Sequence, residues 1–274
     1  MSFPPVIWVP LVVFGLMVGS FLNVCIYRLA REQSIVFPGS HCPFCRHPIA
    51  WFDNIPVLSF LLLRGRCRYC RRTIHWRYPV VELMTALAAV AVAVRFGLTG
   101  EAAVYFAFVC ALIVVSFIDL EFQIIPDEIS LGGLVVGVLL CAALPSLQDT
   151  ASRPLAVGRS LIGVLVGGGV LYLTGLLGDF IFRKESMGGG DIKLLAMAGA
   201  VLGWKLVFLT FFIAPIFALI PGLAVLLFKR SHIIPYGPFL SIGLVVALFA
   251  GNDLLRVTGM EDTIRLIWSY YRPW

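Results

Sequence analysis

The sequence predicts an all-α polytopic membrane protein with about eight transmembrane helices. Hydrophobic residues make up 60% of its 274 residues and charged residues only 13%, whereas soluble domains carry about 25% charged residues. Apolar runs recur along the whole chain, and many approach the length of about 20 residues that a helix needs to cross a bilayer. Most of the surface is therefore expected to face the lipid bilayer, with little soluble mass outside it.

Eight hydrophobic segments are expected to form the membrane helices. They are residues 5–27, 79–96, 102–118, 129–144, 159–181, 191–203, 206–228 and 238–255. The first is expected to be a retained helix, because no basic segment precedes it and no small-residue cleavage site follows it. The sixth is short and follows a glycine cluster, so it is expected to be tilted, broken or buried among the other helices.

The basic residues predict the orientation of the chain. Nine arginines lie between residues 28 and 77, against only two acidic residues, Glu32 and Asp53. Basic loops stay in the cytoplasm, so this loop is expected inside and both termini outside. The formal net charge of +6 is concentrated in this loop, so it indicates topology, and no nucleic-acid partner is expected.

The expected division of the chain has four parts. Residues 1–28 form the first transmembrane helix, residues 29–78 a cytoplasmic module, residues 79–256 the membrane core and residues 257–274 an external interfacial tail. In the tail, aromatic residues are expected to lie at the outer membrane interface. They are Trp268, Tyr270, Tyr271 and Trp274.

Four of the seven cysteines form two Cys-x-x-Cys pairs in the basic loop. Cys42 and Cys45 are separated from Cys67 and Cys70 by 21 residues. Each pair can occupy a tight turn that aims two sulfurs at one point, and two such turns give the tetrahedral cage that structural Zn²⁺ prefers. Disulfides or a redox-active pair are the alternatives, but the cytoplasm is reducing and no thioredoxin-like pattern surrounds either pair. A structural Zn²⁺ is therefore predicted.

Acidic residues are sparse, and three aspartates lie at the expected cytoplasmic membrane boundary. Asp119 ends the third segment, Asp127 follows Pro126, and Asp191 follows the glycines at the start of the sixth. Two close aspartates that share one proton can act as the base and the acid that peptide-bond hydrolysis needs. Glycine before Asp191 would allow close approach of a substrate backbone and a positive φ. Asp119 and Asp191 can therefore meet at one depth and form such a pair.

Carboxylates in these positions also have roles outside hydrolysis. A carboxylate at a helix end is often a cap or a solvated residue, and Asp127 after Pro126 is typical of a helix start. A proton relay is a further use of acids in a membrane. The residues alone leave a protease and a proton-coupled transporter open. A noncatalytic scaffold with a zinc module is a third possibility, but it gives the two aspartates no role.

Several short motifs, in this order, resemble those of type IV prepilin peptidases. The segment Gly188–Asp191 resembles the Gly-x-Gly-Asp signature of membrane aspartyl proteases. Asp119, followed after seven residues by Asp127 in a Pro-Asp pair, resembles the first-aspartate motif of the peptidases. The paired cysteines match the larger bacterial members, and three further matches are Gly19–Val24, Asn54–Ser59 and Tyr78–Leu83. The resemblance covers roughly residues 15–240.

The resemblance implies an aspartic endopeptidase of the bacterial inner membrane. Such enzymes cleave the basic leader of prepilins and pseudopilins after a glycine, at the cytoplasmic face, in type IV pilus or type II secretion systems. It implies that Asp119 and Asp191 are catalytic and that Gly188 and Gly190 belong to the active-site loop. Larger members also N-methylate the new terminal residue, usually phenylalanine, with S-adenosylmethionine. Because the cysteine loop is present, the bifunctional form is expected.

Five further residues are candidates for substrate binding. Glu121, Asp127 and Glu128 lie in the most acidic stretch of the expected cytoplasmic face, where they would attract the Lys and Arg residues of a leader. Asn23 and Glu82 are polar residues in membrane segments. They are expected either to line a substrate groove or to hold helices together.

Overall fold

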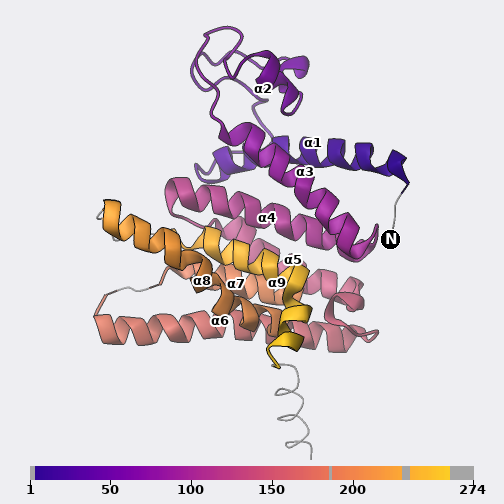
Figure 1. Cartoon of the computed structure of the whole chain (residues 1–274), viewed down its shortest axis with the longest axis vertical. Helices are drawn as coiled ribbons and strands as arrows, with labels where there is room; N and C mark the ends of the chain where they lie inside the picture. The colour runs from indigo at the N-terminus through magenta and orange to yellow at the C-terminus, as the bar shows by residue number, and fades with distance from the viewer. Residues whose placement is uncertain (1–3, 185–186, 230–234, 260–274) are drawn as a thin grey trace, which may run out of the picture. The chain divides into compact units, whose positions relative to one another are not determined.

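The structure is a computed structural model that describes residues 4–184, 187–229 and 235–259 (Figure 1). These residues form helices and two isolated β-bridges, without a strand. All eight predicted segments are helical. They are α1 (Pro5–Leu29), α3 (Arg77–Phe96), α4 (Gly100–Phe122), α5 (Asp127–Ala143), α6 (Arg153–Phe182), α7 (Gly189–Leu202), α8 (Trp204–Lys229) and α9 (Gly237–Val257).

Three short helical elements were not expected. They are the 3₁₀ turn η1 (Trp51–Asn54), the helix α2 (Leu58–Leu62) and the 3₁₀ turn η2 (Pro145–Gln148). The predicted interfacial aromatics after residue 259 lie outside the described residues. The all-α fold is confirmed.

Helix length and composition confirm a polytopic membrane protein. Among the described residues, α1, α3, α4, α6 and α9 are each long and apolar enough to cross a membrane. The helix α5 has 17 residues and α7 has 14. At about 1.5 Å per residue, α7 is shorter than the hydrocarbon core of about 30 Å.

The chain divides into two compact units, Met1–Pro126 and Asp127–Trp274. In the first unit, α1, α3 and α4 pack against one another. The insert between α1 and α3 carries η1 and α2 and lies beside the C-terminal half of α1 and the start of α3 (Figure 1). The helices α1 and α3 approach closely through small residues, because a Cβ on Gly15 would lie 2.6 Å from the Cα of Ala86.

The short helix α7 lies at the centre of the second unit. It contacts α5, α6, α8 and α9, and every residue from Leu194 to Leu202 is buried. The backbones of α6 and α7 meet where Gly163 faces Gly199, and a Cβ on either glycine would overlap the carbonyl oxygen of the other. Close packing through glycine is a common way for membrane helices to associate. The expectation that the sixth segment is buried among its neighbours is confirmed.

The buried end of α7 needs hydrogen-bond partners, because the last carbonyls of a helix have none inside the helix. Side chains from neighbouring elements supply them. The Ala200 carbonyl accepts from the Ser160 hydroxyl at 2.8 Å and from the Gln148 amide at 3.2 Å. The same Gln148 amide lies 3.2 Å from the Val201 carbonyl. The turn η2 therefore allows α7 to end inside the protein.

Replacing Gly163 with alanine is predicted to destabilise the second unit. The added Cβ would meet the Gly199 carbonyl, and overpacking of this kind costs about 1–3 kcal/mol. The matched control is Gly169→Ala on the same helix, where a Cβ meets nothing within 4 Å. Thermal unfolding in detergent should show a lower midpoint for Gly163→Ala and an equal or higher one for Gly169→Ala. Equal midpoints for Gly163→Ala and the parent protein would show that the two backbones are not in close contact.

Candidate active site and metal centre

The two cysteine pairs occupy turns of the same construction. In the first, the backbone N–H of Cys42 donates to the His47 carbonyl at 3.0 Å, and Arg46 has a positive φ of 56°. In the second, the backbone N–H of Cys67 donates to the Arg72 carbonyl at 2.8 Å, and the residue after Cys70 has a positive φ of 58°. An isolated β-bridge closes each turn. Each pair of thiols is therefore directed to one side of its turn.

The four thiols meet at one point and fit a metal ion. The sulfurs of Cys42, Cys45, Cys67 and Cys70 all lie within 4.8 Å of one another, and those of Cys42 and Cys70 are 3.8 Å apart. A tetrahedron with metal–sulfur distances of about 2.3 Å has edges of about 3.8 Å. A disulfide would need about 2.0 Å. The predicted clustering of the four cysteines is confirmed, and the cluster is a candidate metal centre.

One thiol of the cluster loses its proton readily. The backbone N–H of Cys70 stabilises the Cys67 thiolate and lowers the pKa of Cys67 to about 7. Burial and the neighbouring cysteine thiols raise the pKa of Cys70, in the same turn, to about 11. Metal ligation requires thiolates, and Cys67 is the thiol of this turn that deprotonates first.

Contacts between side chains brace the two turns. The ring of His47 lies 3.5 Å from that of Tyr69, measured between centroids. Arg68 forms a bidentate ion pair with Asp53 of η1, at 2.7 and 2.6 Å, and its guanidinium lowers the pKa of the Asp53 carboxyl. These contacts join the insert's otherwise irregular segments around the four sulfurs.

Asp119 lies in the last turns of α4, in the first unit. Its side chain is buried, with 6% exposure. The helix ends at Phe122, and the next residue, Gln123, adopts the left-handed conformation and donates its N–H to the Asp119 carbonyl at 2.9 Å. Nearby, Glu121 forms an ion pair with Arg77 of α3. Asp119 is therefore fixed by a regular helix end, and the charge of Glu121 is balanced within the unit.

The two polar candidates from the membrane segments, Asn23 of α1 and Glu82 of α3, hold the first unit together. Asn23 is buried and donates to the Tyr78 carbonyl at 3.0 Å, which ties α1 to the start of α3. Glu82 is also buried, and its carboxylate accepts the Val57 N–H at 2.7 Å. Asn23 therefore lies at a helix contact, while Glu82 anchors the insert.

Asp191 lies in the first turn of α7, in the second unit. Gly188 precedes the helix with a φ of −70°, so the expected positive φ is wrong at this residue. Gly190 lies inside the helix and continues its first turn. Close approach remains possible at Gly188, where a Cβ would lie 3.4 Å from the Asp191 carboxylate. The helix N-terminus stabilises a negative charge at Asp191.

Two residues near Asp191 were not singled out in the sequence. Lys193 lies two residues further along α7 and binds the carboxylate of Asp127 at 2.7 and 2.9 Å. Tyr236 precedes α9, and burial together with the charge of Asp191 raises its pKa to about 12. Its phenol therefore keeps its proton beside the carboxylate. A lysine or tyrosine next to a membrane helix is common, so the sequence alone carried no signal for these contacts.

The architecture defines a class of protein: a polytopic helical membrane protein with a four-thiol metal module and acidic residues at helix ends. Two family models match in succession. Residues 13–96 match the bacterial peptidase A24 N-terminal domain, and residues 106–223 match the type IV leader peptidase family. No solved structure matches the chain significantly.

Relatives named prepilin leader peptidase/N-methyltransferase are similar to this protein over most of the chain. A relative from Aeromonas hydrophila is 35% identical over 89% of this chain and 90% of its own length. One from Pseudomonas aeruginosa is 35% identical over 89% of this chain and 91% of its own length. One from Myxococcus xanthus is 43% identical over 74% of this chain, a match that spans 58% of the relative. The chain belongs to the type IV leader peptidase family.

Proposed function

We propose that this protein cleaves the basic leader of prepilins and pseudopilins after a glycine and then N-methylates the new N-terminal residue. The observation that carries the proposal is the match to prepilin leader peptidase/N-methyltransferases along 89% of the chain. The inner membrane is the proposed location, with both termini outside and the cleavage site at the cytoplasmic face. The arginine-rich insert supports this orientation.

The proposed catalytic groups are the carboxylates of Asp119 and Asp191. One takes a proton from a water molecule that attacks the carbonyl carbon of the leader's last glycine. The other donates its proton to the departing amine. After cleavage the shared proton of the pair has therefore moved from one aspartate to the other. Gly188 supports this role, because the missing side chain leaves room beside Asp191 for a substrate backbone.

Asp119→Asn and Asp191→Asn are each predicted to reduce leader cleavage by several orders of magnitude without unfolding the protein. The double variant should be little worse than either single variant, because residues that act as a unit are not additive. The control is Asp253→Asn, an exposed residue of α9, which should cleave like the parent. Cleavage is measured on a purified prepilin, and helix content by circular dichroism. Substantial cleavage by one single variant would remove that aspartate from the catalytic pair.

The proposed metal is a structural Zn²⁺ held by Cys42, Cys45, Cys67 and Cys70. The four-sulfur donor set is the one that structural zinc prefers. Zinc binding contributes about 10–16 kcal/mol to the folding of small modules. The insert needs such a contribution, because Cys42 is the one buried hydrophobic residue among its described residues. The proposed methyl donor is S-adenosylmethionine, which would supply an electrophilic methyl group.

One Zn²⁺ per chain is predicted in protein purified without a metal-affinity resin. Cys67→Ser should lower the zinc content and expose the insert to protease, because one of four ligands is lost. Cys110→Ala is the matched control, since Cys110 is buried in α4 away from the insert. Elemental analysis gives the metal content. Zinc near zero in a fully active parent protein would refute the structural role.

Two of the three acidic residues that are candidates for leader recognition are already in ion pairs. Glu121 is paired with Arg77, and Asp127 with Lys193. Glu128 is exposed and, within the described part of the chain, forms no ion pair. We therefore propose that Glu128 attracts the leader's Lys and Arg residues, although an exposed pair contributes only about 0–1 kcal/mol.

Glu128→Gln is predicted to raise the Michaelis constant for a basic leader a few-fold and to leave turnover unchanged. The effect should weaken at high salt. A second substrate with a neutralised leader provides the comparison, and Glu32→Gln provides a control at an acidic residue of the insert. If Glu128→Gln and the parent show the same preference between the two leaders, Glu128 does not read the leader.

A further inference from the structure

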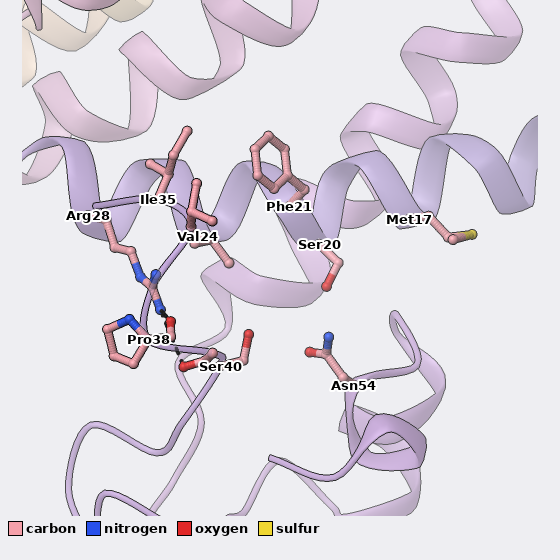
Figure 2. Close-up of a pocket in the computed structure, with 11 residues that line it drawn as sticks. Met17, Ser20, Phe21, Val24, Arg28, Ile35, Pro38, Ser40 and Asn54 are labelled. Carbon is pink, nitrogen blue, oxygen red and sulfur yellow. Dashed lines mark hydrogen bonds between the residues drawn. The ribbon is translucent and has the colours of Figure 1, made fainter. Parts of the chain in front are cut away.

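A pocket of about 270 Å³ lies in the first unit, on the face of α1 where the insert begins (Figure 2). Its floor is a single stripe of α1 that runs from Met17 to Arg28, with lining residues spaced three or four apart. Its opposite wall is formed by the segment 35–40, together with Asn54 at the end of η1. No residue of this pocket belongs to the cysteine cluster or carries one of the two proposed catalytic carboxylates.

Arg28 fixes one wall of the pocket. Its side chain is buried, with 7% exposure. The guanidinium donates to the carbonyl of Ser34 at 2.9 Å. It also donates to the carbonyls of Pro38 at 2.5 Å and Gly39 at 3.4 Å (Figure 2). Among the described residues it forms no ion pair with a carboxylate. The pocket therefore has a fixed wall and an uncompensated positive charge at one end.

Glu82 fixes the other wall. Its buried carboxylate accepts the N–H of Val57 at 2.7 Å, and it lies near the Ser20 hydroxyl at the pocket floor. Val57 follows Asn54 closely in sequence and has a positive φ of 59°. These contacts hold Asn54 opposite Ser20, as Figure 2 shows. The pocket is thus preformed by buried polar contacts on both sides.

The lining suits an apolar residue with a polar end. Met17, Phe21 and Val24 supply an apolar floor, and Phe21 remains 50% exposed. Ser20 and Asn54 supply hydroxyl and amide oxygens that accept hydrogen bonds. Sites for drug-sized ligands measure about 300–1,000 Å³, so this pocket is small for a whole nucleoside-containing methyl donor. It is large enough for one aromatic residue.

We propose that this pocket binds the first residue of the mature pilin after the leader has been removed. The aromatic side chain lies against Met17, Phe21 and Val24, and the free α-amine lies between Ser20 and Asn54. The inference rests on the proposed function, since it gives the N-methyltransferase reaction its acceptor site. Ser20 and Asn54 position the amine, and Glu82 acts through Ser20.

The chemistry of methyl transfer is consistent with this site. The lone pair of the neutral amine attacks the methyl carbon of a sulfonium donor, the carbon–sulfur bond breaks, and its electron pair stays on sulfur. The product methylammonium then releases a proton to water. An α-amine titrates near neutral pH, at about 7.7–8.0, so the neutral form is accessible.

Peptide binding tests the pocket without requiring methyl transfer. The probe is a labelled peptide with the apolar sequence of a mature pilin N-terminus, beginning with phenylalanine and a free amine. Its twins are N-acetylated or begin with alanine. The parent protein in detergent is expected to bind the free-amine phenylalanine peptide at least tenfold more tightly than either twin. Val24→Trp fills the pocket and should abolish this preference.

Two further variants make the test decisive. Val13→Trp lies on the same stripe of α1, one turn outside the pocket, and should keep the preference. Phe21→Ala enlarges the pocket and should shift the preference several-fold toward a peptide that begins with tryptophan, a change that misfolding does not produce. An unchanged preference in both Val24→Trp and Phe21→Ala would overturn the proposal. So would weaker binding of S-adenosylmethionine by Val24→Trp with peptide binding intact, because the pocket would then hold the donor.

The same peptides separate this inference from the proposed function. A parent protein that binds them as expected but transfers no methyl group contradicts the methyltransferase function and leaves the peptide site in place. A parent protein that methylates a cleaved pilin, while Val24→Trp methylates it equally well, contradicts the pocket alone.

Discussion

The close contact between the backbones of α6 and α7 is the constraint on which the second unit depends. The helix α7 is too short to cross a bilayer, and it is surrounded by four other helices. At Gly163 and Gly199 the backbones of α6 and α7 are in direct contact, because neither residue has a side chain. Gln148 and Ser160 then satisfy the carbonyls at the buried end of α7. Because α7 is held along its length, Asp191 at its opposite end has a fixed position at the start of a helix.

The insert of the first unit is stabilised by a different means. Its segments are short and irregular, and the described part contains only one five-residue α-helix and one 3₁₀ turn. Four thiols gathered within 4.8 Å take the place of an apolar core, and a metal ion with its ligands would hold them together. Glu82 and Arg28 attach the insert to α3 and α1 through part-buried hydrogen bonds. The insert and the membrane helices thus form one surface at the pocket.

Hydrophobic runs and cysteine spacing predicted the helices and the four-thiol cluster, because both depend on local pattern. The bounds of α4 and α5 place Asp119 and Asp127 at helix ends, as the sequence indicated. The ion pairs of Glu121 and Asp127 were not predictable, since each joins residues more than 40 positions apart. The pairing of Gln148 with the end of α7 also depends on tertiary contact. Glycine before Asp191 was expected to allow a positive φ, but Gly188 has a φ of −70° and the helix starts at the next residue.

The proposed function gives this protein two successive activities on one substrate. The most direct measurement is the mass of the N-terminus of a purified prepilin after incubation with the purified protein, with and without S-adenosylmethionine. Both samples are expected to lose the leader after its glycine, and the new N-terminus should gain the mass of one methyl group only when the donor is present. A prepilin that keeps its leader in both samples would contradict it.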